Sequence, residues 1–131
     1  MRRQFQLAEE DEACLTARSP NWEAIVENNT KWVIVPDFTI PEGYNQRTAS
    51  AAMRILPSYP DDQIDMVYFF PPLERTDRHP IATISSQLIC GETYQRWSRH
   101  RTSANPWRPG VDDISTHVTL VDEWLRRELT R

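Results

Sequence analysis

Residues 59–107 read YPDDQIDMVYFFPPLERTDRHPIATISSQLICGETYQRWSRHRTSANPW, and this stretch decides the fold expected of the chain. It contains an apolar run, residues 64–70, between an acidic pair and a proline pair, which is typical of a β-strand. Further along, Cys90 follows an apolar pair and precedes Gly91. A lone buried cysteine is most often a small apolar residue, but a chain with two cysteines and no disulfide framework is free to use a thiol chemically.

Upstream of this stretch, three more segments have the composition of strands: residues 22–26, 32–35 and 51–56. Asn28-Asn29 predicts a hairpin turn between the first two, and Pro36 is expected to stop the second. Connections this short join neighbouring strands, so the four strands are expected to form an antiparallel meander.

Helices are predicted at both ends. Residues 5–17 have an apolar side that includes Cys14, which is therefore expected to be a packing residue. From Val111 onward apolar residues recur at helical spacing, with Asp112 and Asp113 in the expected first turn and His117 on the flank of the apolar stripe. The sequence thus predicts an α+β fold: an N-terminal helix, a four-stranded antiparallel meander, a loop-rich active-site segment and a C-terminal helix.

Composition indicates one ordinary domain, residues 1–131, with 39% hydrophobic and 26% charged residues. No apolar run is long enough to cross a membrane, the first residues lack the apolar region of a signal peptide, and two cysteines predict a reducing cytoplasm. Neither cysteine belongs to a Cys-x-x-Cys pair and the three histidines are scattered, so no metal or other cofactor is expected.

The charge balance, 15 basic against 19 acidic residues, argues against general nucleic-acid binding. The exception is the basic segment 96–101, Arg-Trp-Ser-Arg-His-Arg. Two interpretations stay open there: a groove for an acidic protein or a nucleic acid, and an arginine-rich loop exposed to solvent.

Several motifs taken together resemble the ubiquitin-conjugating (E2) fold. They are Tyr59-Pro60 between the third and fourth strands, His79-Pro80 ahead of Cys90, and Trp107-Arg108-Pro109 before the last helix. More narrowly, residues 34–44, 95–100 and 107–113 are similar to the prokaryotic E2-like family E. Proteins of that family accompany an E1-like adenylating enzyme, a ubiquitin-like protein and often a JAB-type metalloprotease.

The resemblance implies that Cys90 accepts a ubiquitin-like protein from an E1 as a thioester and transfers it to an amine. A thiolate is a strong nucleophile, and a thioester is activated toward amines. Ile81 stands where the family's His-Pro-Asn motif has its asparagine, a donor to the oxyanion. Loss of one such donor typically costs about 10²–10³ in rate. We expect His100 to supply the missing group, with His79, His117 and Asp112 as further candidates.

Other interpretations remain open at this stage. An oxyester on Ser85 or Ser86 is an alternative to the Cys90 thioester. The chain could also be an E2 variant that binds a ubiquitin-like protein without catalysis, or a nucleic-acid-binding module that uses residues 96–101. In E2 folds the N-terminal helix faces the E1, so its acidic residues are expected to contact that partner: Glu9, Glu10, Asp11 and Glu12.

Overall fold

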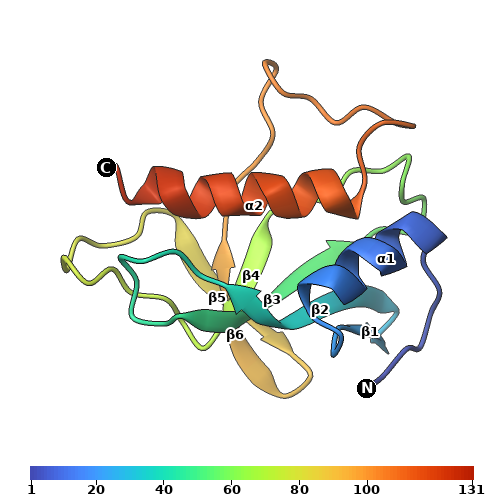
Figure 1. Ribbon diagram of the computed structural model, residues 1–131, viewed down its shortest axis with the longest axis horizontal. Helices are drawn as coiled ribbons and strands as arrows, with labels where there is room; N and C mark the ends of the chain where they lie inside the picture. The colour runs from blue at the N-terminus through green and yellow to red at the C-terminus, as the bar shows by residue number, and fades with distance from the viewer.

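The computed structural model describes residues 1–131 and places two helices on one face of an antiparallel sheet (Figure 1). The sheet has six strands in the order β1-β2-β3-β4-β6-β5. The helices are α1 (Glu9–Arg18) and α2 (Ile114–Glu128), and the strands are β1 (Glu23–Glu27), β2 (Thr30–Thr39), β3 (Thr48–Ile55), β4 (Val67–Phe70), β5 (Ile84–Ile89) and β6 (Glu92–Trp97). The predicted α+β class is confirmed, and the predicted count of four strands is wrong.

The first four strands form the expected meander. Asn28 and Asn29 both have positive φ, 51° and 63°, as the tight turn between β1 and β2 requires. Pro36, however, does not stop β2. The register shifts between Val35 and Phe38, and this bulge lets the strand continue past a residue that has no N–H to donate.

The segment expected to be loop-rich contains a hairpin instead. β5 and β6 pair along their whole length, from Ile84↔Trp97 to Ile89↔Glu92. The two residues between them, Cys90 and Gly91, have φ values of 50° and 80°, so the connection is a two-residue turn. A two-residue connection that ends in glycine is a hairpin signal, and Cys90-Gly91 was present in the sequence.

Both helices begin later than predicted. Residues 5 and 7 lie in an extended segment and pack against the core from there, while α1 begins at Glu9 with an acidic first turn. Asp113 is the N-cap of α2: its carboxylate accepts from the Thr116 N–H at 3.2 Å, and the Thr116 hydroxyl accepts from the Asp113 N–H. Neither aspartate therefore lies in the first turn of the helix.

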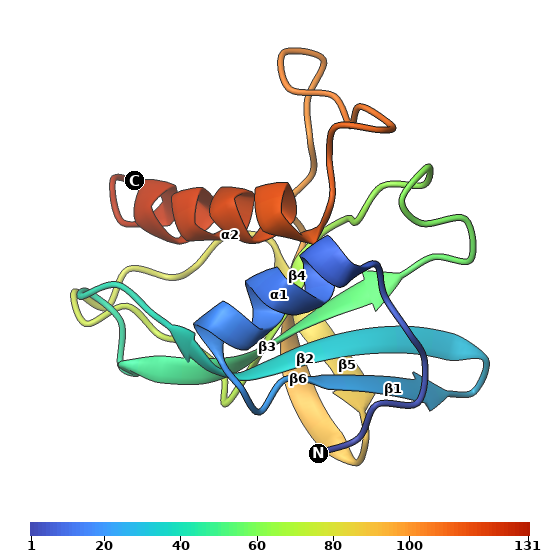
Figure 2. The same ribbon diagram turned by 45° about the vertical axis from the view of Figure 1, so that its right-hand side comes forward.

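The apolar core has two layers. The larger one fills the space between the sheet and the helices, with Leu15, Phe69, Trp97 and Leu125 fully buried. The smaller lies on the opposite face and joins Trp32 and Tyr68 to Ile89 and Tyr94 of the hairpin. The hairpin extends beyond the rest of the sheet, away from α2 (Figures 1 and 2). Its turn consequently reaches β1, although β1 and β5 are opposite edges of the sheet.

The segment 98–113 rises beyond the first turn of α2 (Figure 2). Neither helix is long and apolar enough to span a membrane.

Candidate functional site

Cys90 occupies the turn of the β5–β6 hairpin, and its thiol is partly exposed. Its backbone N–H donates to both carboxylate oxygens of Glu27, at 3.2 and 3.0 Å. Nη1 of Arg2 lies 3.6 Å from Sγ. The thiol is thus fixed between the hairpin, the end of β1 and the N-terminal segment. We call Arg2, Glu23, Glu27 and Cys90 the tip site.

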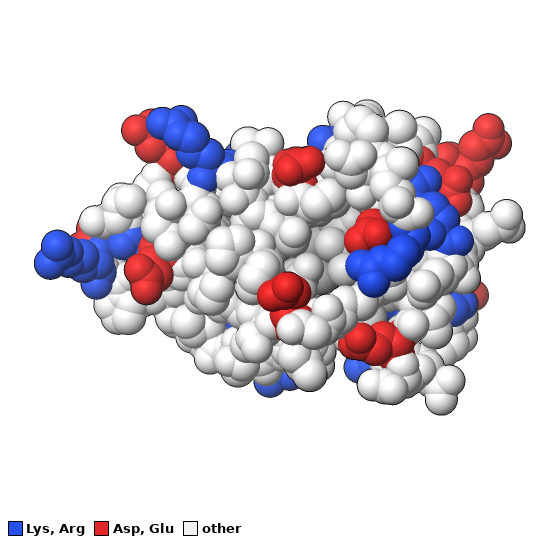
Figure 3. All heavy atoms as spheres, turned by 90° about the horizontal axis from the view of Figure 1, so that it is seen from below, with Lys and Arg blue, Asp and Glu red and all other residues white.

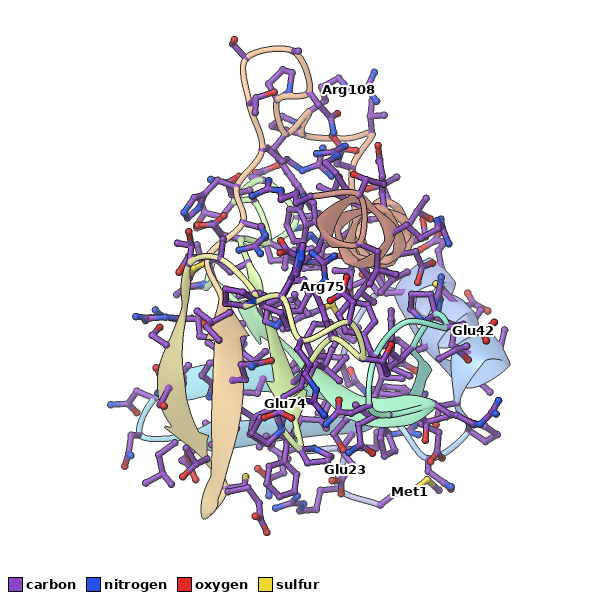
Figure 4. The ribbon with its side chains drawn as sticks, turned by 90° about the vertical axis from the view of Figure 1, so that its left-hand side faces the viewer. Met1, Glu23, Glu42, Glu74, Arg75 and Arg108 are labelled. Atoms are coloured by element: carbon purple, nitrogen blue, oxygen red, sulfur yellow. The ribbon has the colours of Figure 1, made fainter.

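Arg2 is oriented toward the thiol by Glu23. Its Nε and Nη2 donate to the two carboxylate oxygens of Glu23 at 3.0 and 2.9 Å, and its backbone N–H adds a third bond. These hydrogen bonds lower the pKa of Glu23 to about 2, and they raise the pKa of Arg2. Figure 4 shows Glu23 low in the molecule, on the side away from α2. Arg2 therefore places a fixed positive charge next to Sγ.

The backbone of Cys90 has an unusual conformation for its residue type. A φ of 50° belongs to the left-handed region, which glycine, asparagine and aspartate adopt most readily. The first position of such a hairpin turn strongly prefers those residues. A residue held there against its preference is a pointer to function, because the fold could use a better turn former.

The other cysteine has a different environment. Cys14 lies on α1 and packs against the main core, as predicted. Burial raises the pKa of its thiol, with Arg18 only partly opposing the effect. A thiol whose pKa is raised supplies little thiolate at neutral pH. Of the two cysteines, only Cys90 has a guanidinium in contact with its sulfur.

The structure does not bring His100 to Cys90. His100 follows the end of β6 at Trp97, whereas Cys90 precedes its start at Glu92. Six strand residues span about 20 Å, so the two side chains lie at opposite ends of the hairpin. Nδ1 of His100 lies 2.9 Å from the Asp65 carboxylate, in a hydrogen bond at the surface of the protein. The expectation that His100 acts beside Cys90 has no support in this geometry.

Two further candidates have structural partners. Asp112 is 4% exposed, accepts from the Arg108 N–H at 2.7 Å and lies near the Arg101 guanidinium. Burial acts to raise its pKa, but these donors outweigh burial, and the pKa is lowered. His117 is fully buried: Nε2 donates to the Met66 carbonyl at 2.9 Å, and burial lowers its pKa to about 4. Both residues are held far from solvent.

The remaining candidates are divided between loop and strand. His79 is exposed in the segment before β5, and its N–H donates to Asp77. Ile81 belongs to the main core, so this position contributes packing where the E2 motif has an amide. Ser85, on β5, accepts a bond from Arg96 Nε at 2.8 Å. No group that could act as a base is bonded to the Ser85 hydroxyl.

Two of the three arginines in the basic segment 96–101 are held within the fold. Arg99 donates to the buried Glu128 at 2.9 Å, and Arg101 pairs with Asp112. Both guanidiniums also lie over indole rings, those of Trp97 and Trp107. On the face away from α2, charges of both signs lie in small scattered groups on a largely uncharged surface (Figure 3). Arg99 and Arg101 are therefore not part of a solvated loop. A hollow of about 260 Å³ beside them is lined by Arg99, His100 and Arg127, and the groove stays a prediction.

The Tyr59-Pro60 and Trp107 motifs identified in the sequence hold the two helices and the neighbouring loops together. The Tyr59 hydroxyl donates to Asp11 of α1 at 2.7 Å and accepts from the Ile114 N–H, the first of α2, at 2.8 Å. Trp107 Nε1 donates to the Pro60 carbonyl. The tyrosine-proline turn therefore joins both helices. It also removes Asp11 from the acidic surface expected to meet an E1, which leaves Glu9 and Glu10 exposed.

Sequence reasoning missed Arg2, Glu23 and Glu27. Arg2 and Glu27 are 88 and 63 positions from Cys90 in the chain, and no motif connects them. The one available signal was the hairpin turn at Cys90-Gly91, which would have placed the thiol at the end of a strand pair. Which residues meet that turn depends on how far the sheet curls. No group of three or more histidine, cysteine or acidic side chains is arranged to hold a metal ion.

Comparison with models of protein families matched residues 7–128 to the one described as prokaryotic E2 family E. The matched range includes both helices, all six strands and Cys90, while Arg2 lies before it. A search of curated proteins and a search of solved structures gave no match.

Proposed function

The chain belongs to prokaryotic E2 family E, and from that premise we propose that Cys90 carries a ubiquitin-like protein as a thioester. Membership implies E1-like and ubiquitin-like partners in general. The observation that supports Cys90 as the acceptor is its placement at positive φ, partly exposed, with a guanidinium 3.6 Å from its sulfur. A fixed donor beside the sulfur can stabilise the negative charge that develops when the sulfur attacks a thioester.

The reaction has two steps. In the first, the Cys90 thiolate attacks the thioester carbonyl on the E1; the new C–S bond forms, and the E1 thiolate leaves. In the second, an amine attacks the Cys90 thioester, the C–N bond forms, the C–S bond breaks, and the amine loses a proton to solvent. Each step passes through a tetrahedral oxyanion, which a fixed donor next to the sulfur would stabilise.

Arg2 takes the role that Ile81 leaves unfilled in this proposal. It is the donor in contact with Sγ, and its orientation is fixed by Glu23 before any substrate arrives. A donor that is already oriented contributes more to the transition state than one that must be ordered during the reaction. Because the side chain is about half exposed, we expect Arg2→Ala to slow discharge to amines by about tenfold, below the range typical of buried donors.

The test combines the purified protein with the E1-like and ubiquitin-like proteins of its gene neighbourhood and ATP. The products are separated on a gel without reductant. We expect a reductant-sensitive adduct that Cys90→Ala abolishes and Cys14→Ala preserves. An adduct that Cys14→Ala alone removes would refute the assignment. An adduct stable to reductant but lost in hydroxide would assign Ser85 or Ser86 instead.

Discharge of the isolated thioester to free lysine separates the roles of Arg2 and His100. We expect Arg2→Ala to slow it, Arg2→Lys to restore part of the rate, and His100→Ala to leave it unchanged. Slow discharge in a stable His100→Ala protein would return the histidine to the mechanism. If no adduct forms in any reaction but the ubiquitin-like protein still binds, the chain is a non-catalytic E2 variant.

A further inference from the structure

Strand β5 is an open edge of the sheet that leads to the tip site. It pairs only with β6, and its last residue, Ile89, directly precedes Cys90. An open edge presents unpaired backbone N–H and C=O groups to any extended chain that approaches it. A second strand added there would end beside the reactive thiol.

The hairpin register shows which groups are free. In a two-residue hairpin the residues that flank the turn, Ile89 and Glu92, form a hydrogen-bonded pair, and bonded and unbonded pairs then alternate along the ladder. Ile84, Ser86 and Leu88 therefore direct their N–H and C=O groups outward. The Leu88 carbonyl is covered by the side-chain amide of its own neighbour Gln87, at 3.2 Å.

The same three residues share one face of the sheet, where exposed apolar surface lies. Ile84 is 42% exposed and Leu88 is 63% exposed, and both are among the few large apolar side chains at the surface of the protein. At the start of β5, Ile84 and Ile81 line a hollow with a volume of about 530 Å³. Two exposed apolar side chains thus lie along this edge, Ile84 beside the hollow and Leu88 near Cys90.

We propose that β5 binds the extended C-terminal tail of the ubiquitin-like protein as an added parallel strand, which brings the tail's terminal carbonyl to Cys90. The proposal rests on the proposed thioester function. The direction follows from connectivity: only a strand parallel to β5 has its carboxyl end at the Cys90 end. About six residues of tail match the six residues of β5.

The proposal also specifies the chemistry of the tail. Neighbouring strands share side-chain faces, so every second residue of the tail lies beside Ile84 or Leu88 and should be apolar. The last residues should be small, because the acyl carbon must come within bonding distance of Sγ in a site already occupied by Arg2. The backbone bonds would supply affinity, and the alternate apolar contacts specificity.

The test needs no natural partner. Two synthetic probes are compared on the full-length protein: the benzyl thioesters of acetyl-Val-Thr-Val-Thr-Gly-Gly and of acetyl-Gly-Gly. In each reaction the Cys90 thiolate takes the acyl group and benzyl thiolate leaves. Mass spectrometry locates the acylated cysteine. We expect the long probe to acylate Cys90 at least about tenfold faster than the short one, since the long probe alone forms the added strand.

A backbone variant identifies the edge. Ser86→Pro removes an outward N–H and leaves the ladder to β6 intact. We expect this variant to lower the rate of Cys90 acylation by the long probe to about the rate seen with the short probe. Acylation by the short probe should be as fast as in the parent protein, which shows that the thiol is still in place. Leu88→Lys should lower the acylation rate of the long probe by a smaller factor and leave the acylation rate of the short probe unchanged.

Modified probes repeat the test without any mutation. Only one edge of the added strand faces β5, so only every second amide of the long probe would bond to it. N-methylation of that alternate set should abolish the faster acylation of Cys90, and N-methylation of the other set should leave it unchanged. Equal rates for the long and short probes would overturn strand addition while leaving the thioester chemistry standing. Failure of both probes to acylate Cys90 would instead contradict the proposed function.

Discussion

The two ends of the β5–β6 hairpin contain similar residue types in opposite environments. At the tip site, Arg2, Glu23 and Glu27 surround Cys90, and Arg2 is half exposed. At the other end, near α2, Glu128 is 2% exposed and contacts Arg75, Arg99 and Arg131. Figure 4 shows Arg75 just beneath α2 and Glu23 lower in the molecule, farther from that helix. The comparison separates two settings of arginine and carboxylate pairs: buried beneath a helix at one end, and in contact with solvent and a thiol at the other.

The largest expected effect is a loss of stability at the buried end of the hairpin, near α2, when one side chain is replaced by one of the same shape. Glu128→Gln keeps the shape but leaves the guanidiniums of Arg75 and Arg99 without their shared carboxylate, and we expect a loss of about 4 kcal/mol in the free energy of unfolding. Chemical denaturation followed by circular dichroism measures it. The matched control is Glu123→Gln on the same helix, whose exposed pair with Arg127 should contribute less than about 1 kcal/mol. Equal losses for both variants would refute the distinction.

His117 should make the buried end sensitive to pH. Its pKa is about 4 in the folded protein and near the ordinary 6.5 when unfolded, so between these values the unfolded chain binds more protons. Stability therefore falls as the pH drops from 6.5 to 4, by about 3 kcal/mol in total. We expect His117→Gln, which can still donate to the Met66 carbonyl, to flatten the pH dependence in this window. A parent protein whose stability is constant there would contradict the assignment.

At the tip site, the bond from the Cys90 N–H to Glu27 should have a moderate effect. Glu27→Gln keeps one acceptor but removes the charge, and we expect a loss of about 1 kcal/mol in the free energy of unfolding. Charging of Cys90 should slow as well, because the turn becomes less fixed. Glu92→Gln, an exposed carboxylate on the other side of the turn, is the control and should change neither quantity.

The smallest stability effect is expected at Glu23. Its pKa of about 2 lies below the ordinary 4.5, so the pair with Arg2 stabilises the fold fully above pH 4.5 and loses that contribution as the pH falls toward 2. Solvent screens the pair, and Glu23→Gln should cost less than about 1 kcal/mol at pH 7. The reactivity of Cys90 with iodoacetamide should nevertheless fall, since Arg2 is no longer directed at Sγ. Unchanged reactivity would remove Arg2 from the site.

The sequence predicted much of the fold and less of the site. Runs of apolar residues between prolines and asparagines gave the first four strands, because each turn is encoded by the residues that form it. The β5–β6 hairpin was missed because its outer strand has exposed side chains and little apolar alternation. His100 and Asp112 were reasonable catalytic types, but their partners, Asp65 and Arg108, give them other roles.

The sequence by itself determined the α+β class, the four-strand meander, the presence of a helix at each end of the chain, and the family. These features depend on local periodicity, turn residues and short motifs. Only the tertiary structure decided the surroundings of Cys90. The curl of the sheet brings a hairpin turn from one edge to Glu27 at the other, and the N-terminal segment adds Arg2. Such contacts join residues far apart in the chain, and the packing of the second apolar layer fixes them rather than any local preference of the residues involved.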